Sequence, residues 1–159
     1  MSTISVVRGV GRAGTAMASY DAALADANVH NYNLVTVSSV VPAEATVELV
    51  ETAPDLGPAG NRLTVVQSKA TRAPGESGAA VAGIGWARSE SGRGIFYEAT
   101  GDDTAAVRDT IERGLAGGQE LRDWTFIEED AVVRETAASA DEHTALVVCA
   151  VYGQSTPIL

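Results

Sequence analysis

One stretch constrains the fold more than any other: the β-rich apolar run from Asn33 to Pro42, which carries two adjacent serines, Ser38 and Ser39. Leucine, valine and threonine around the serines favour a strand, and the proline ends it. Two hydroxyls within an apolar run need hydrogen-bond partners when they are buried. The serine pair is therefore either satisfied by neighbouring backbone or used for chemistry.

The rest of the chain predicts many strands and two separated helices. One helix is predicted over 15–26, where Ala16, Tyr20 and Ala23 recur at helical spacing, and another begins at Asp102-Asp103 and ends or breaks at Gly117-Gly118. Strands are predicted at 3–10, closed by Gly9 and Gly11, and at 46–50, 63–70, 79–88, 94–99, 124–133 with a charged interruption at 128–130, and 144–152. We expect a loose tail over 153–159. The pattern is typical of an α+β layered sandwich, in a single domain over residues 1–159.

The charge balance is strongly acidic. The chain has 21 acidic and 11 basic residues, of which only Lys69 is a lysine, and its net charge is −10. Such a surface repels nucleic acid and anionic lipid and attracts a cationic substrate. The acid-rich, lysine-poor balance also resembles that of proteins from salt-loving microbes, in which salt screens the repulsion between carboxylates. That second explanation accounts for the charge without any function.

Several classes of function have no support in the sequence. No run of 18 apolar residues predicts a membrane span, and the N-terminal residues do not form a signal peptide, so we expect a cytoplasmic protein. The single Cys149 excludes an intrachain disulfide and is expected to be a buried thiol. The two histidines, His30 and His143, lie in no CxxC or HExxH motif, so no metal site is predicted.

The run from Asn31 to Ala45, NYNLVTVSSVVPAEA, resembles the self-cleavage segment of the pyruvoyl-dependent arginine decarboxylases. Four shorter motifs follow the family's order and extend the resemblance over most of the chain: YDAAL at 20–24, APGES at 73–77, YEATG at 97–101 and EHT at 142–144. The resemblance implies an αββα four-layer sandwich that assembles as a homotrimer. It also implies a zymogen cleaved into a β chain, 1–38, and an α chain, 39–159, whose first residue is a pyruvoyl group derived from Ser39.

The chemistry of the serine pair agrees with this resemblance. The hydroxyl of Ser39 follows the carbonyl of Ser38 and can attack it when the backbone there is strained. The resemblance makes Ser39 and Glu98 catalytic, with Glu98 as the general acid, and it places Asp21, Asn33 and Ser38 in substrate binding. A carboxylate such as Asp21 can accept two parallel hydrogen bonds from a guanidinium. Asn33 is also a candidate for polarising the Ser38 carbonyl.

The function implied is the conversion of L-arginine to agmatine and carbon dioxide in polyamine biosynthesis, with the covalent pyruvoyl group as the only cofactor. Two alternatives stay open: the same chemistry on another amino acid, and a relative that never cleaves and acts as an oligomeric small-molecule-binding protein. Met17 and His30 depart from the family's pattern, in which leucine and a small residue are expected. These two positions bear on the fine substrate specificity more than on the mechanism.

Overall fold

The computed structural model describes residues 2–159. The two helices are α1 (Ala16–Asp26) and α2 (Thr104–Glu120). The strands are β1 (Thr3–Ala13), β2 (Asn33–Thr36), β3 (Val40–Val41), β4 (Thr46–Glu51), β5 (Arg62–Arg72), β6 (Ala79–Ser89), β7 (Gly94–Gly101), β8 (Phe126–Ala137) and β9 (His143–Tyr152).

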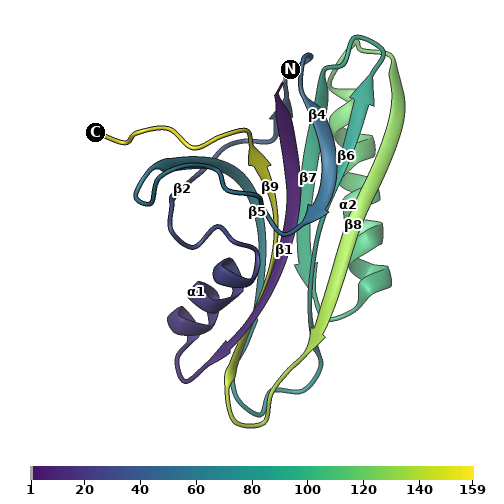
Figure 1. Cartoon of the computed structure of the whole chain (residues 1–159). Coiled ribbons are helices and arrows are strands. Elements are labelled where there is room, and N and C mark those ends of the chain that lie inside the picture. Colours follow the sequence, from purple (N-terminus) through teal and green to yellow (C-terminus); the bar gives the residue numbers. More distant parts are fainter. Residues whose placement is uncertain (1) are drawn as a thin grey trace.

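The strands form two sheets with a helix on the outer side of each (Figure 1). The first sheet has the order β2-β5-β9-β1-β4, and the second has the order β3-β7-β6-β8. One apolar cluster, which includes Val6 and Leu146 of the first sheet and Ile84 and Phe96 of the second, lies between them. A second cluster joins α1 to the first sheet, and a third joins α2 to the second sheet. The mixed architecture of two sheets and two helices agrees with the predicted α+β class.

The helices begin where the sequence predicts. Thr15 caps α1, because its hydroxyl accepts a hydrogen bond of 3.1 Å from the amide of Ala18. Asp103 caps α2 in the same way, with a bond of 2.8 Å from the amide of Ala106. Both caps satisfy backbone amides that the first helical turn leaves free.

The expectation that Gly9 and Gly11 close the first strand is wrong, because β1 continues to Ala13. Both glycines lie where α1 crosses the strand. A Cβ atom on Gly9 would lie 1.9 Å from the backbone oxygen of Ala23, and one on Gly11 would lie 2.3 Å from the backbone nitrogen of the same residue. These two glycines are therefore contact points that let the helix lie directly on the strand.

Three further local predictions need correction. Gly117 and Gly118 lie inside α2, which continues to Glu120. The acidic segment 128–130 lies within β8, whose ladder with β6 continues through all three residues, and their side chains are exposed. The tail is held in part, because Thr156 exchanges backbone hydrogen bonds of 2.7 and 2.9 Å with Arg62. Glycine content and polarity predict an end to the helix and an interruption of the strand. In the structure, packing continues the helix and pairing with β6 continues the strand.

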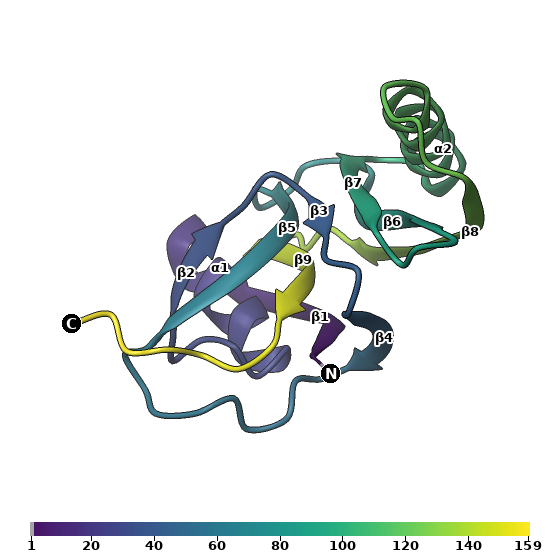
Figure 2. The ribbon, with the colours of Figure 1, turned by 90° about the horizontal axis from the view of Figure 1, so that it is seen from above.

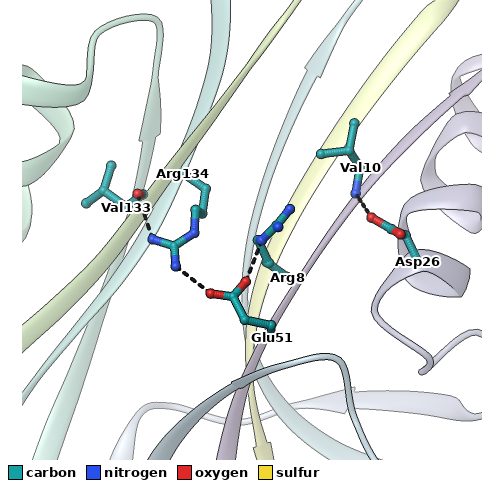
Figure 3. A network of polar contacts seen from close by, with 6 residues as sticks. All are labelled: Arg8, Val10, Asp26, Glu51, Val133 and Arg134. Atoms are coloured by element: carbon teal, nitrogen blue, oxygen red, sulfur yellow. Dashed lines mark hydrogen bonds and ion pairs between the residues drawn. The ribbon is translucent and has the colours of Figure 1, made fainter.

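An ion-pair network joins the two sheets (Figure 3). Glu51, at the end of β4, accepts hydrogen bonds from Arg8 of the first sheet and from Arg134 of the second, the latter at 2.7 Å. Arg134 lowers the pKa of the Glu51 carboxyl most, and the hydrogen bond from Arg8 lowers it further. Glu51 has a φ of 64°, a left-handed conformation that is uncommon for this residue type.

Candidate active site

The serine pair lies where the chain crosses from one sheet to the other. β2 pairs with β5 in the first sheet, and the amide of Val37 continues this ladder with a bond of 3.0 Å to the carbonyl of Val65. β3 pairs with β7 in the second sheet. The prediction of one continuous strand from Asn33 to Val41 is therefore wrong at the serines. The peptide bond between Ser38 and Ser39 lies between two segments that are held by different sheets.

The backbone of Ser39 is in an uncommon conformation. Its φ of 65° lies in the left-handed region, which for a residue with a side chain costs on the order of 1–3 kcal/mol. The carbonyl oxygen of Ser39 accepts a hydrogen bond of 2.9 Å from the amide of Phe96 on β7. The surrounding structure thus maintains local strain beside the bond that the sequence singles out.

A surface hollow of about 440 Å³ opens beside the two serines. We call it the serine hollow; its lining residues are Ser38, Ser39, Ile95, Phe96, Tyr97, Glu98, Gly114, Gly118, Leu121 and Arg122. Glu98 follows Ser39 by 59 residues in the sequence, yet it lines the same hollow as the two serines. The structure therefore brings together three of the five predicted site residues.

Two glycines of α2 let the helix come close to the floor of the hollow. A Cβ atom on Gly114 would lie 2.5 Å from the ring of Tyr97, and one on Gly118 would lie 2.6 Å from Cδ1 of Ile95. Tyr97 and Ile95 belong to β7, which also carries Glu98. The close approach of α2 to β7 therefore determines the shape of the hollow.

Glu98 is exposed in the single chain. Its carboxylate lies close enough to the Tyr152 side chain to affect the ionisation of the phenol. Burial, and then the negative charge of Glu98, raise the pKa of Tyr152 to about 12. The Tyr152 hydroxyl donates a hydrogen bond of 2.9 Å to the carbonyl of Val40, the residue after Ser39.

Arg122 adds a positive charge to the serine hollow. Its Nη1 donates a hydrogen bond of 2.8 Å to the carbonyl of Gly118 near the end of α2. Its guanidinium also lies 5.5 Å from the ring centre of Trp124, which Arg93 approaches to 4.6 Å. Sequence reasoning missed both Arg122 and Tyr152. Arg122 could have been found from the sequence, because it lies two residues before Trp124, one of only two tryptophans. Tyr152 has no such signal beyond its position at the end of an apolar run.

Asp21 and Asn33 do not line the serine hollow. Asp21 is exposed on α1, which packs on the first sheet at the side of the domain away from α2 (Figure 2). The hollow lies against β7 and α2. The side-chain amide of Asn33 donates a hydrogen bond of 2.8 Å to the carbonyl of Gly60. Met17, the other helical position of interest, is 82% exposed on α1. Within a single chain, Asp21, the predicted ligand of the guanidinium, therefore lies outside the hollow that the serine pair lines.

The structure also bears on metals and membranes. Within residues 2–159 no three histidine, cysteine or acidic side chains gather closely enough to hold a metal ion. Neither helix in that range has the length and apolar character needed to cross a membrane. Cys149 is buried, and burial raises the pKa of its thiol to about 12.

Comparison with known proteins gives one consistent family. A family model described as pyruvoyl-dependent arginine decarboxylase matches residues 3–157. The pyruvoyl-dependent arginine decarboxylase of Halobacterium salinarum is 51% identical over 160 residues, covering 99% of this chain and 98% of that protein. The protein of the same name from Methanopyrus kandleri is 32% identical and covers 93% and 94%, and that of Pyrococcus horikoshii is 31% identical and covers 80% and 83%.

Proposed function

The chain belongs to the pyruvoyl-dependent arginine decarboxylase family, and from this premise we propose that it converts L-arginine to agmatine and carbon dioxide after cleaving itself between Ser38 and Ser39. The observation that carries the proposal is the common location of Ser38, Ser39 and Glu98 around one hollow, beside a strained backbone. The cleaved protein would consist of a β chain, 1–38, and an α chain, 39–159. Both would stay in the same domain, since separate sheets hold the two ends.

In the proposed cleavage, Oγ of Ser39 attacks the carbonyl carbon of Ser38. The C–N bond breaks, and the nitrogen takes the hydroxyl proton, so that an ester replaces the amide. Loss of the Cα proton of residue 39 then breaks the Cβ–O bond and leaves Ser38 with a free carboxylate. Water finally replaces the nitrogen at residue 39, which releases ammonia and leaves the pyruvoyl group at the head of the α chain.

The residues around Ser39 fit such a group. The pyruvoyl ketone would supply the electron sink for the loss of carbon dioxide from a bound amino acid. The amide of Phe96 would hold the oxygen of the adjoining amide carbonyl, which is the carbonyl of residue 39. Glu98 would deliver a proton to the carbon that loses the carboxylate, and Arg122 would contribute the positive charge in the hollow.

Arginine recognition would require a second copy of the chain. Asp21 is the proposed ligand of the substrate guanidinium, with Asn33 and Ser38 as further substrate-binding residues, but α1 and α2 lie at opposite sides of one protomer (Figure 2). A homotrimer of αββα sandwiches would let α1 of one protomer reach the serine hollow of the next. Closing that hollow between protomers would also cover Leu121, which is 84% exposed in the single chain.

The first test is a denaturing intact-mass spectrum of protein purified in high salt, combined with an agmatine assay. We expect two chains, split after Ser38, with the longer chain carrying a ketone in place of its amine, and agmatine formed from arginine. Two chains without agmatine formation would favour another amino acid as substrate. A single chain that stays uncleaved on long incubation would reject the decarboxylase and favour a binding protein.

A second test addresses the shared site. Asp21→Asn and Glu98→Gln remove groups that would come from different protomers of one site. Each variant alone should be nearly inactive. Mixed oligomers formed by co-expression should regain activity, because random assortment of two variants leaves about a quarter of two-chain sites intact. If oligomers that are shown to contain both variants stay inactive, the idea of a site shared in this way is rejected. Either one protomer then supplies both Asp21 and Glu98, or Asp21 is not part of the site.

A further inference from the structure

Tyr152 connects the first sheet to the segment that follows the serine pair. It is the last residue of β9, where it pairs with Ile4 of β1, yet its hydroxyl donates a hydrogen bond of 2.9 Å to the carbonyl of Val40. Val40 is the first residue of β3 in the second sheet. The carbonyl of Ser39 is held from the other side, by the amide of Phe96 at 2.9 Å. The two carbonyls that follow the scissile bond are therefore fixed by different sheets.

Aromatic packing directs the Tyr152 hydroxyl. The ring of Tyr152 packs edge-on against Phe96, with ring centres 6.0 Å apart and planes at 66°. Phe96 packs in turn against Trp86, with ring centres 6.3 Å apart and planes at 68°. Edge-to-face contacts of this kind are favourable and restrict ring orientation. Tyr152 thus presents its hydroxyl to Val40 from a fixed position.

The hydroxyl also keeps its proton under ordinary conditions. Burial of the ring, followed by the charge of Glu98, raises the pKa of Tyr152 to about 12. A phenol with this pKa is neutral at neutral and mildly alkaline pH, so it acts as a hydrogen-bond donor throughout that range.

These contacts oppose the relaxation of Ser39. The apolar sequence around the serines favours an extended strand, but residue 39 has a φ of 65°. A change of Ser39 toward the extended conformation would move the carbonyl of Ser39 away from the amide of Phe96. It would also move the carbonyl of Val40 away from the hydroxyl of Tyr152. Loss of either bond would therefore make the left-handed conformation less populated.

Building on the proposed self-cleavage, we propose that Tyr152 is a positioning residue for that reaction, which holds the carbonyl of Val40 and thereby keeps Ser39 in its strained, left-handed conformation. Tyr152 transfers no proton and forms no bond to a reacting atom. Its contribution is to the rate of chain cleavage, and this rate can be measured without any assay of the mature enzyme.

The experiment compares Tyr152→Phe with a matched control, Tyr32→Phe. The Tyr32 hydroxyl also donates a hydrogen bond of 2.9 Å to a backbone carbonyl, that of Gly57, in a loop away from the serine hollow. Full-length chains are synthesised in a cell-free system in high salt, and their cleavage is followed over time on denaturing gels. The temperature is kept well below the Tm of each variant, which is measured separately.

We expect Tyr152→Phe to cleave about three- to tenfold more slowly than the natural chain, which is the effect of losing one hydrogen bond, and Tyr32→Phe to cleave at the natural rate. Cleavage of Tyr152→Phe at the natural rate would overturn the proposal. Equal slowing of cleavage in both variants would also overturn the proposal, because lower stability of the fold would then explain the slower cleavage. A natural chain that does not cleave at all would reject the proposed function itself, which separates the two failures.

Discussion

The amide of Phe96 donates a hydrogen bond of 2.9 Å to the carbonyl oxygen of Ser39, and this contact attaches the second serine of the pair to the second sheet. On the other side of the pair, Val37 is attached to the first sheet through Val65. The bond between the serines thus lies in the short segment that spans the two sheets. A break there leaves each new end within its own sheet, so cleavage need not unfold the domain.

Replacing the attacking hydroxyl should abolish cleavage. Ser39→Ala lacks the Oγ atom that forms the ester, and we expect one chain of full mass after long incubation in high salt. Ser38→Ala is the matched control, since it keeps the Ser39 hydroxyl and should still yield two chains. Intact-mass spectra under denaturing conditions distinguish these results. Two chains from Ser39→Ala would show that the serine hydroxyl is not the nucleophile.

Replacing Glu98 should separate maturation from turnover. Glu98→Gln keeps the size of the side chain but removes its proton-donating carboxyl group. We expect two chains of normal mass and a fall in kcat for agmatine formation of about 10²-fold or more, which is the usual contribution of a general acid. The matched control is Glu48→Gln on β4, an exposed carboxylate outside the serine hollow, and it should keep normal kcat. Normal turnover in Glu98→Gln would remove Glu98 from proton transfer.

The Glu51 network should make stability depend on pH and salt. The hydrogen bonds from Arg134 and Arg8 lower the pKa of Glu51 in the folded state. The resulting stabilisation is therefore present above the pKa of the unfolded carboxyl, about 4.3, and is lost as the pH falls through the lower, folded pKa. Because the Glu51 side chain is 43% exposed, we expect Glu51→Gln to reduce the free energy of unfolding by only about 0.2–1 kcal/mol.

Denaturant unfolding of the natural chain and Glu51→Gln checks this expectation at neutral pH and at about pH 3, below the carboxyl pKa values of unfolded chains. The difference between the two proteins should shrink at the lower pH. It should also shrink with added salt at neutral pH, because salt screens exposed charges. A difference that is independent of both pH and salt would contradict an electrostatic origin.

Glycine substitutions should distinguish contact glycines from free ones. Gly9→Ala places a Cβ atom 1.9 Å from the backbone oxygen of Ala23, so α1 must move, and we expect a loss of about 3 kcal/mol or more in the free energy of unfolding. Gly117→Ala is the matched control on α2, since its Cβ atom meets nothing within 4 Å. Alanine favours a helix over glycine by about 1 kcal/mol, so Gly117→Ala should stabilise the protein. Thermal unfolding measures both changes, and a tolerated Gly9→Ala would contradict the close packing of α1.

Features determined by neighbouring residues could be predicted from the sequence. Thr15 and Asp103 cap the predicted helices, and the apolar run from Ala145 to Val151 forms a fully buried strand. The chemical potential of the Ser38-Ser39 pair could also be recognised, because a hydroxyl and the carbonyl that it attacks are adjacent along the chain. The family resemblance extended this recognition to Glu98, which lines the same hollow.

Only the tertiary structure decided where these residues lie relative to one another. The break in the strand at the serines arises because β5 and β7, from different sheets, pair with its two halves. The role of Gly118 inside α2, the contact of Tyr152 with Val40, and the separation of Asp21 from the hollow likewise depend on pairs of residues distant along the chain. Local propensity describes how each segment folds, whereas the packing of distant segments determines which side chains meet.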